Sequence, residues 1–142
     1  MAVLFMVLAV IAAACGVGYL VLGVRQWQGK GHPLSYWMRS NTLKDAESRA
    51  GWDRSLVPAG LMCLSGAVLI GNGAISGARP PSGSAGAAIA IGSLLALLFF
   101  AGLVLTIMNF NRPRFLVPPH LRGQLGAIAG RRRRRREHLP MR

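Results

Sequence analysis

Charged residues are missing from two long stretches of this chain, and this limits the folds that it can adopt. The first 24 residues carry no charged side chain, and Arg79 is the only one between Ser55 and Asn111. The apolar residues form unbroken blocks without a polar face, whereas a soluble domain places them on stripes or alternating positions. Such blocks, separated by basic segments, are typical of a chain that crosses a lipid bilayer several times.

Three segments are long and apolar enough to span a bilayer. A helix rising ~1.5 Å per residue needs about 20 apolar residues to cross a hydrocarbon core of roughly 30 Å. None of the segments alternates polar and apolar residues, so each is predicted to be a helix rather than a barrel strand. The predicted segments are a transmembrane helix (1–24), a basic and aromatic cytoplasmic loop (25–54), a second transmembrane helix (55–77), a short extracytoplasmic turn (78–86), a third transmembrane helix (87–110) and a basic cytoplasmic tail (111–142).

The distribution of Lys and Arg predicts the orientation. The segment 25–54 contains six of them, the turn contains Arg79, and the tail contains ten. Because basic residues collect on the cytoplasmic side of a membrane, we predict a multi-pass protein of the bacterial cytoplasmic membrane. Its N-terminus is then outside and its C-terminus is cytoplasmic.

The cytoplasmic segments carry fewer structural signals. Thr42 followed by Asp45 indicates a helix start, and Gly51 a stop, so a short interfacial helix is predicted over about 42–50. The pair Pro118 and Pro119 favours an extended course along the membrane surface. The six consecutive arginines repel one another and are expected to be disordered. The predicted fold class is therefore all-α: three transmembrane helices, one short interfacial cytoplasmic helix and a disordered basic tail.

The net charge of +13 indicates an anionic partner. Membrane lipids with anionic headgroups are favoured over nucleic acid, because no aromatic platform or binding module accompanies the arginine run. Trp residues in the first loop are interpreted as headgroup anchors, with docking of a protein partner as the alternative. The candidate lipid- or partner-contact residues are Arg131, Arg132, Arg133, Arg134, Arg135, Arg136, Trp27, Trp37 and Trp52.

Small residues recur four positions apart within the spans, which places them on one face of a helix. Such faces allow close packing in lipid, either within the chain or in a homo-oligomer, and packing within the chain is favoured. The members are Ala12 and Gly16, then Ala14 and Gly18, in the first helix; Ala59, Cys63, Ala67 and Gly71, then Gly73 and Gly77, in the second; and Ser84, Ala88, Gly92 and Ala96 in the third.

The residues predict no catalytic, cofactor-binding or metal site. The spans contain no ionisable residue of the kind that transport and proton relays need, and His32, His120 and His138 lack metal-ligand spacing. Asn72 and Asn109 lie near helix ends, where water or headgroups can satisfy them. We therefore expect a non-enzymatic interaction or accessory protein. The alternative is a small oligomeric channel or transporter subunit.

One segment carries a resemblance. The run from Phe110 to Arg122, together with the three-span layout, resembles small three-span integral membrane proteins of high-GC actinobacteria. The resemblance covers 13 residues. It implies a membrane location and transfers no catalytic or binding residue.

Overall fold

The computed structural model describes residues 2–30, 51–76, 84–123, 128–129 and 133. It contains the helices α1 (Ala2–Trp27), α4 (Leu56–Ser76) and α5 (Ser84–Phe110), followed by the 3-10 helices η1 (Arg114–Leu116) and η2 (Pro119–Leu121). The three long helices are each long and apolar enough to cross a membrane, and no strand occurs in the described ranges. The all-α, three-span fold class is thereby confirmed. The expected interfacial helix over 42–50 and nearly all of the arginine run lie outside these ranges.

The long helices extend beyond the apolar blocks that predicted them. α1 continues to Trp27 instead of residue 24, and α5 begins at Ser84 instead of residue 87. Hydropathy marks the part of a helix that suits lipid, whereas backbone hydrogen bonding continues into the headgroup region. At ~1.5 Å per residue, the 27 residues of α5 span roughly 40 Å, about the thickness of a bilayer with its headgroups.

α1 ends in a glycine turn that brings two basic residues together. Gly29 adopts a left-handed φ of 71°, its N–H donates to the Gln26 carbonyl at 3.1 Å, and the Lys30 N–H donates to the Arg25 carbonyl at 3.1 Å. This pair of bonds is the Schellman pattern, in which glycine takes the conformation that other residues avoid. The turn therefore holds Lys30 beside Arg25.

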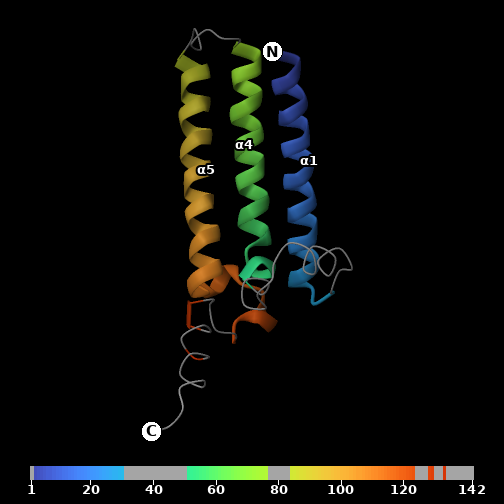
Figure 1. The fold of residues 1–142 in the computed structure, drawn as a ribbon, viewed down its shortest axis with the longest axis vertical. Helices are drawn as coiled ribbons and strands as arrows, with labels where there is room; N and C mark the ends of the chain where they lie inside the picture. The colour runs from blue at the N-terminus through green and yellow to red at the C-terminus, as the bar shows by residue number, and fades with distance from the viewer. Residues whose placement is uncertain (1, 31–50, 77–83, 124–127, 130–132, 134–142) are drawn as a thin grey trace. The chain divides into compact units, whose positions relative to one another are not determined.

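The chain forms two compact units. Unit 1 consists of residues 1–21 and 57–102, and unit 2 consists of residues 22–56 and 103–142. In unit 1, α4 lies between α1 and α5 (Figure 1). Unit 2 contains the C-terminal end of α5, the helical residues 51–54 and the segment that follows Phe110.

Two glycines bring α1 and α4 close together in unit 1. A Cβ added to Gly16 would lie 3.0 Å from the Gly60 carbonyl oxygen, and one added to Gly60 would lie 2.9 Å from the Gly16 carbonyl oxygen. The side chains of Leu64 and Leu20 cover the same two positions, at 2.9 Å and 2.8 Å from the added Cβ atoms. The backbones therefore touch where both helices lack a side chain, as in other close helix contacts in lipid.

α4 packs against α5 through a different set of residues. A Cβ on Gly66 would lie 3.2 Å from Cδ1 of Leu97, which places that leucine against the α4 backbone. Asn72 donates from Nδ2 to the Gly86 carbonyl at 3.1 Å, so a neighbouring helix satisfies this amide where we expected water or headgroups. Asn109 instead donates to the Leu105 carbonyl of its own helix at 2.8 Å.

The predicted small-residue faces are only partly used for packing. Ala59 and Ala67 of α4 are buried, in agreement with close packing of that helix. On α5, however, Ser84, Ala88 and Gly92 are exposed, so this face does not pack the hairpin as expected. The reason is that the α4–α5 contact uses a large side chain, Leu97, against a glycine. Small residues on both sides are not required.

The two cysteines offer a direct check of the α1–α4 register. Cys15 precedes Gly16 and Cys63 precedes Leu64, and both thiols are free. The contact between Gly16 and Leu64 therefore puts the cysteines at one level of two neighbouring helices. We expect copper(II)–phenanthroline or mercury(II) to link them within one chain. A protease site inserted between residues 31 and 50 makes the link visible, because linked fragments stay together after cleavage.

The single variants Cys15→Ala and Cys63→Ala serve as controls and should give separate fragments after the same treatment. Addition of a thiol reductant should also separate the wild-type fragments. A wild-type protein that yields only links between different chains would contradict the α1–α4 register.

Candidate functional site

All of the described basic residues belong to unit 2. The described residues of unit 1 contain neither Lys nor Arg. The single described acidic residue, Asp53, also belongs to unit 2. Unit 2 therefore has a strong positive excess and is the natural place to look for an anion-binding surface. Its described basic residues are Arg25, Lys30, Arg54, Arg112, Arg114, Arg122 and Arg133.

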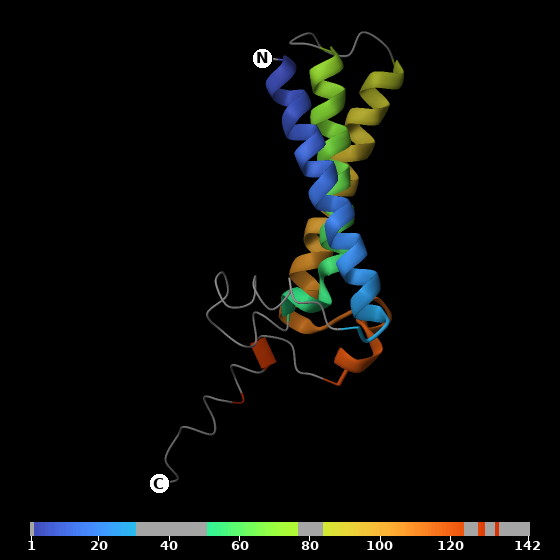
Figure 2. The same cartoon turned by 90° about the vertical axis from the view of Figure 1, so that its right-hand side faces the viewer.

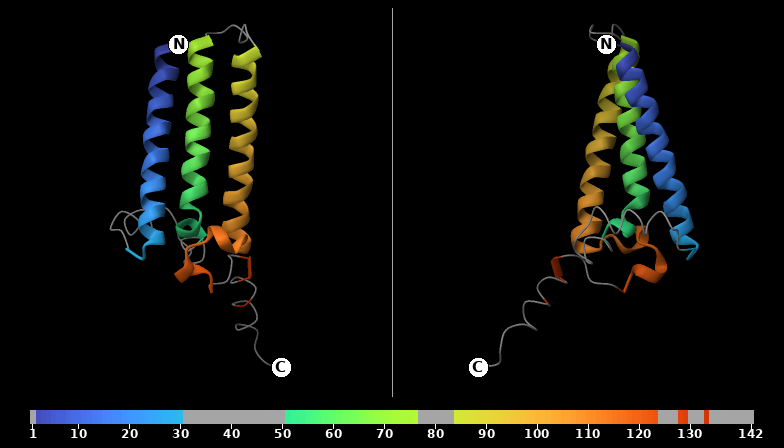
Figure 3. Two further views of the ribbon diagram at one scale, coloured as in Figure 1. Left: turned by 180° about the vertical axis from the view of Figure 1, so that it is seen from behind. Right: turned by 45° about the vertical axis from the view of Figure 1, so that its right-hand side comes forward.

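The helical residues 51–54 pack closely against the end of α5 (Figure 3). A Cβ on Gly51 would lie 3.1 Å from the Met108 carbonyl oxygen and 3.3 Å from Met108 Cα, so a residue with a side chain would require the two backbones to move apart by a few tenths of an ångström. Gly51 was expected to end a helix, but it is itself helical. The helical turn ends at Ser55, whose N–H and Oγ donate to the Trp52 carbonyl at 3.0 Å and 3.1 Å.

Two charged residues in this turn are buried. Asp53 is 8% exposed and Arg54 is 2% exposed. Burial lowers the pKa of the Arg54 guanidinium from its ordinary value, and the neighbouring Asp53 carboxylate opposes that shift. An Arg side chain stays protonated at neutral pH even so. Arg54 is therefore a structural charge next to an acid and is not part of the accessible basic surface.

The segment after α5 folds into a compact turn instead of the extended course that we expected from its two prolines. Asn111 takes a left-handed φ of 55°, a conformation in which Asn is enriched, and its N–H donates to the Ile107 carbonyl at 3.0 Å. Leu116 N–H then donates to the Pro113 carbonyl at 3.2 Å, and Leu121 N–H donates to the Pro118 carbonyl at 2.9 Å. These bonds define η1 and η2.

Apolar contacts fix this segment beside the end of α5 (Figure 2). Ile107 and Val117 are fully buried, Leu121 is 9% exposed, and these residues form one cluster. Leu103 and Leu116 pack against it. The extended prediction was wrong because Val117 and Leu121, four residues apart, find an apolar partner on α5. Proline is readily accommodated at the first position of a helical turn, as Pro119 shows in η2.

Two side-chain hydrogen bonds close the segment. Asn111, which is 6% exposed, donates from Nδ2 to the Arg122 carbonyl at 3.4 Å. Arg122 donates from Nε to the Val117 carbonyl at 3.0 Å. The side chain of Asn111 is thereby joined to the backbone of Arg122, so Arg122 lies beside the residue that precedes Arg112.

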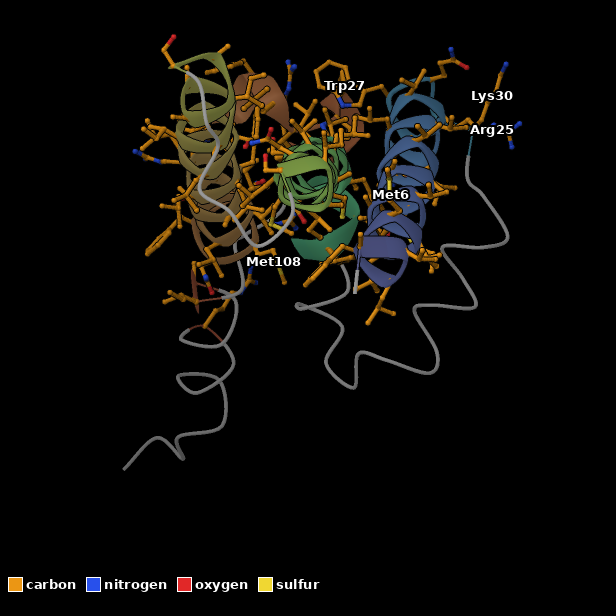
Figure 4. All side chains as sticks on the ribbon, turned by 90° about the horizontal axis from the view of Figure 1, so that it is seen from above. Met6, Arg25, Trp27, Lys30 and Met108 are labelled. Atoms are coloured by element: carbon orange, nitrogen blue, oxygen red, sulfur yellow. The ribbon has the colours of Figure 1, made fainter. Side chains whose placement is uncertain are left out.

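The structure describes some of the predicted contact residues. Trp27 is 40% exposed at the end of α1, and it lies on the opposite side of that helix end from Arg25 and Lys30 (Figure 4). Trp52 is half-buried, and Arg133 is exposed. The other five arginines of the run and Trp37 lie outside the described ranges.

Arg112 and Arg122 were not among the predicted contact residues, because they are isolated in the sequence and lie outside the arginine run. The available signal was the apolar spacing of Val117 and Leu121 close to an Asn–Arg–Pro sequence, which marks a turn that can fold back. That spacing did not identify Ile107 as the partner.

Unit 1 contains a shallow apolar groove between α4 and α5. It has a volume of about 410 Å³ and is lined mainly by leucine, isoleucine, valine and phenylalanine side chains. Two serines also line it, but Ser65 donates to the Leu61 carbonyl at 2.9 Å and Ser93 to the Ile89 carbonyl at 2.7 Å. The surface of the groove is therefore mostly apolar, and both serine hydroxyls donate to carbonyls of their own helices.

Among the described residues, no three His, Cys, Asp or Glu side chains come together in a way that could hold a metal ion. Comparisons with protein-family models, curated proteins and solved structures found no match to this chain.

Proposed function

We propose that this chain is a non-enzymatic protein of the bacterial cytoplasmic membrane that acts by contact, through a basic cytoplasmic surface that binds anionic lipid headgroups. In this proposal unit 2, which includes the tail 111–142, faces the cytoplasm, and the N-terminus is outside. The resemblance of Phe110–Arg122 to small actinobacterial membrane proteins agrees with this location.

The observation that carries the proposal is the gathering of basic residues in unit 2. Arg25, Lys30, Arg112, Arg122 and Arg133 are all exposed, whereas the single described acid, Asp53, is buried. A basic residue close to an anionic membrane surface contributes about 1 kcal/mol. The three spans already anchor the chain, so this interaction is available to select lipids or to recruit a partner that competes with them.

The alternative of a small channel or transporter subunit has less support. A polar path through the spans would need side chains that hydrate an ion or a polar solute. Ser65 and Ser93 are among the few polar residues there, and both hydroxyls donate to carbonyls of their own helices. A homo-oligomer formed through the exposed α5 face remains compatible with either function.

Lipid selection by the full-length protein tests the proposal. We would reconstitute it in bilayers of phosphatidylcholine and phosphatidylglycerol with the same acyl chains, and count the retained lipids by native mass spectrometry after mild detergent extraction. The wild type should retain phosphatidylglycerol in excess of its mole fraction. Changing Arg131 to Arg136 to Gln should reduce the excess by about tenfold or more, since six charges are removed. High salt should weaken it as well.

A six-lysine variant at Arg131 to Arg136 is the matched control, because it keeps the charge and should keep the lipid excess. If the wild type retains the two lipids in the proportions of the bilayer, the proposal is wrong. Protein-dependent ion flux in the same proteoliposomes would favour the channel alternative.

A further inference from the structure

We infer that Arg112 and Arg122 form a defined binding site for the phosphodiester of an anionic phospholipid, with Phe115 inserted beside its acyl chains. The inference rests on the proposed function and goes further. It replaces a diffuse attraction to the whole basic surface with one site in the segment 111–122.

The segment 111–122 has a fixed shape. Its backbone bonds define two 3-10 turns, and Val117 and Leu121 are anchored in the apolar cluster with Ile107. A site built on such a segment loses less conformational entropy when it binds a ligand than a flexible basic tail does. The segment can therefore select one ligand geometry, whereas a run of arginines acts mainly through total charge.

Arg112 and Arg122 lie at the two ends of one closed loop. They are ten residues apart in sequence, yet the bond from Asn111 to the Arg122 carbonyl closes the loop between them. Arg122 uses Nε to hold the Val117 carbonyl at 3.0 Å, which orients the guanidinium and leaves its terminal N–H groups for a ligand. Arg112 is exposed immediately after Asn111.

No acidic side chain within this segment competes with a ligand for the two arginines. The run from Phe110 to Gly123 contains no Asp or Glu. Arg54, by contrast, is buried next to Asp53 and already has that carboxylate close by. Two exposed arginines at the two ends of a closed loop, with no acid in that segment, favour a ligand with oxygen anions, and guanidinium groups match phosphate in geometry.

Exposed aromatic rings in and just before this segment favour a lipid as the source of the phosphate. Phe115 is 70% exposed in η1, and Phe110 is 60% exposed at the last residue of α5. α5 is one of the three candidate spans, so the segment that follows it begins where the apolar span ends. Aromatic rings next to arginines are typical of the membrane–water interface. A free phosphate would use only the arginines and would make no contact with these rings.

The test compares pairs of charge removals in the full-length protein, with the lipid-retention measurement described above. Arg112→Gln/Arg122→Gln removes two exposed charges from the proposed site. Arg25→Gln/Lys30→Gln removes two exposed charges from another part of unit 2 and is the matched control. We expect the first pair to lower phosphatidylglycerol retention by roughly 25-fold, about fivefold for each arginine, and the control pair to change it by less than about threefold.

Equal losses in the two pairs would overturn the site and leave the proposed function standing, because only total charge would then matter. A wild type without any phosphatidylglycerol excess would overturn both. Soluble inorganic phosphate that displaces the retained lipid at millimolar concentration would overturn the assignment to a lipid. Retention insensitive to phosphate supports it.

Two further variants separate lipid contact from folding of the segment. Arg112→Gln alone removes a ligand contact without removing any of the hydrogen bonds given above, so it should lower retention about fivefold with the Leu121 amide still protected from exchange. Phe115→Ala should lower retention more for long than for short acyl chains. If Arg112→Gln retains lipid like the wild type, the site is wrong.

Discussion

Leucine in place of Gly16 or Gly60 should separate α1 from α4 and abolish the internal link between Cys15 and Cys63. A Cβ at either position would lie 3.0 Å or less from the backbone oxygen of the other glycine, and a leucine side chain is much larger. Overpacking of this kind costs about 1–3 kcal/mol. We expect a cost at the upper end of this range or beyond, because one of the opposing atoms at each position is a backbone oxygen, which cannot move aside as the neighbouring leucine side chain can. The measurement is the yield of linked fragments, with the melting temperature in detergent.

Gly18→Leu is the matched control for this experiment. Gly18 lies in the same helix two residues away, and a Cβ there would meet nothing within 4 Å. Leucine also favours a helix over glycine by several tenths of a kcal/mol or more. The control should therefore link its cysteines like the wild type and melt at the same or a higher temperature. Equal loss of the link in the Gly16 and Gly18 variants would refute the proposed crossing point.

A smaller substitution shows which atoms limit the approach. Gly16→Ala should be partly rescued by Leu64→Ala, because the Leu64 Cγ, 2.9 Å from the added Cβ, is then gone. Rescue should be incomplete, since the Gly60 oxygen stays 3.0 Å away. Complete rescue would mean that the leucine alone sets the distance between the helices.

The three spans could be predicted because the requirement for crossing a bilayer concerns only the order of residues along the chain. About 20 consecutive apolar residues satisfy it, and no information on neighbours is needed. The partners of those spans could not be predicted in the same way. Small residues occur on several faces of α1 and α4, and Gly60, the partner of Gly16, belongs to none of the four-residue repeats that we noted. On α5 the regular repeat with Gly92 is exposed, and Leu97 makes the contact.

The segment 111–122 shows a second limit of sequence reasoning. Two adjacent prolines and several basic residues favour an extended chain when only local preferences are counted. The structure differs because Val117 and Leu121 gain a buried partner, Ile107, which belongs to the preceding helix. This tertiary contact outweighs the local preference. The folded segment also places Arg122 beside Asn111, the residue before Arg112, so the candidate lipid site could not be recognised before the fold was known.

Asparagine in place of Val117 should release the whole segment 111–122 from α5. Val117 is fully buried against Ile107 and Leu121, and an amide of similar size would lose its hydrogen bonds to water there. Burial of an unsatisfied polar group costs about 1–3 kcal/mol in proteins, and the lost apolar burial adds to this. The amides of Leu116 and Leu121, which donate to the Pro113 and Pro118 carbonyls, report the release through faster hydrogen exchange.

Phe115→Asn is the matched control, because it introduces the same side chain two residues away at a position that is 70% exposed. Protection of the Leu121 amide should fall by tenfold or more in Val117→Asn and remain near the wild-type value in the control. The two variants should also differ in lipid retention. Val117→Asn keeps both Arg112 and Arg122 but loses the geometry that holds them together, so it should retain phosphatidylglycerol as poorly as the double arginine variant. Unchanged retention with loss of exchange protection would show that charge alone, and not the fold of this segment, selects the lipid.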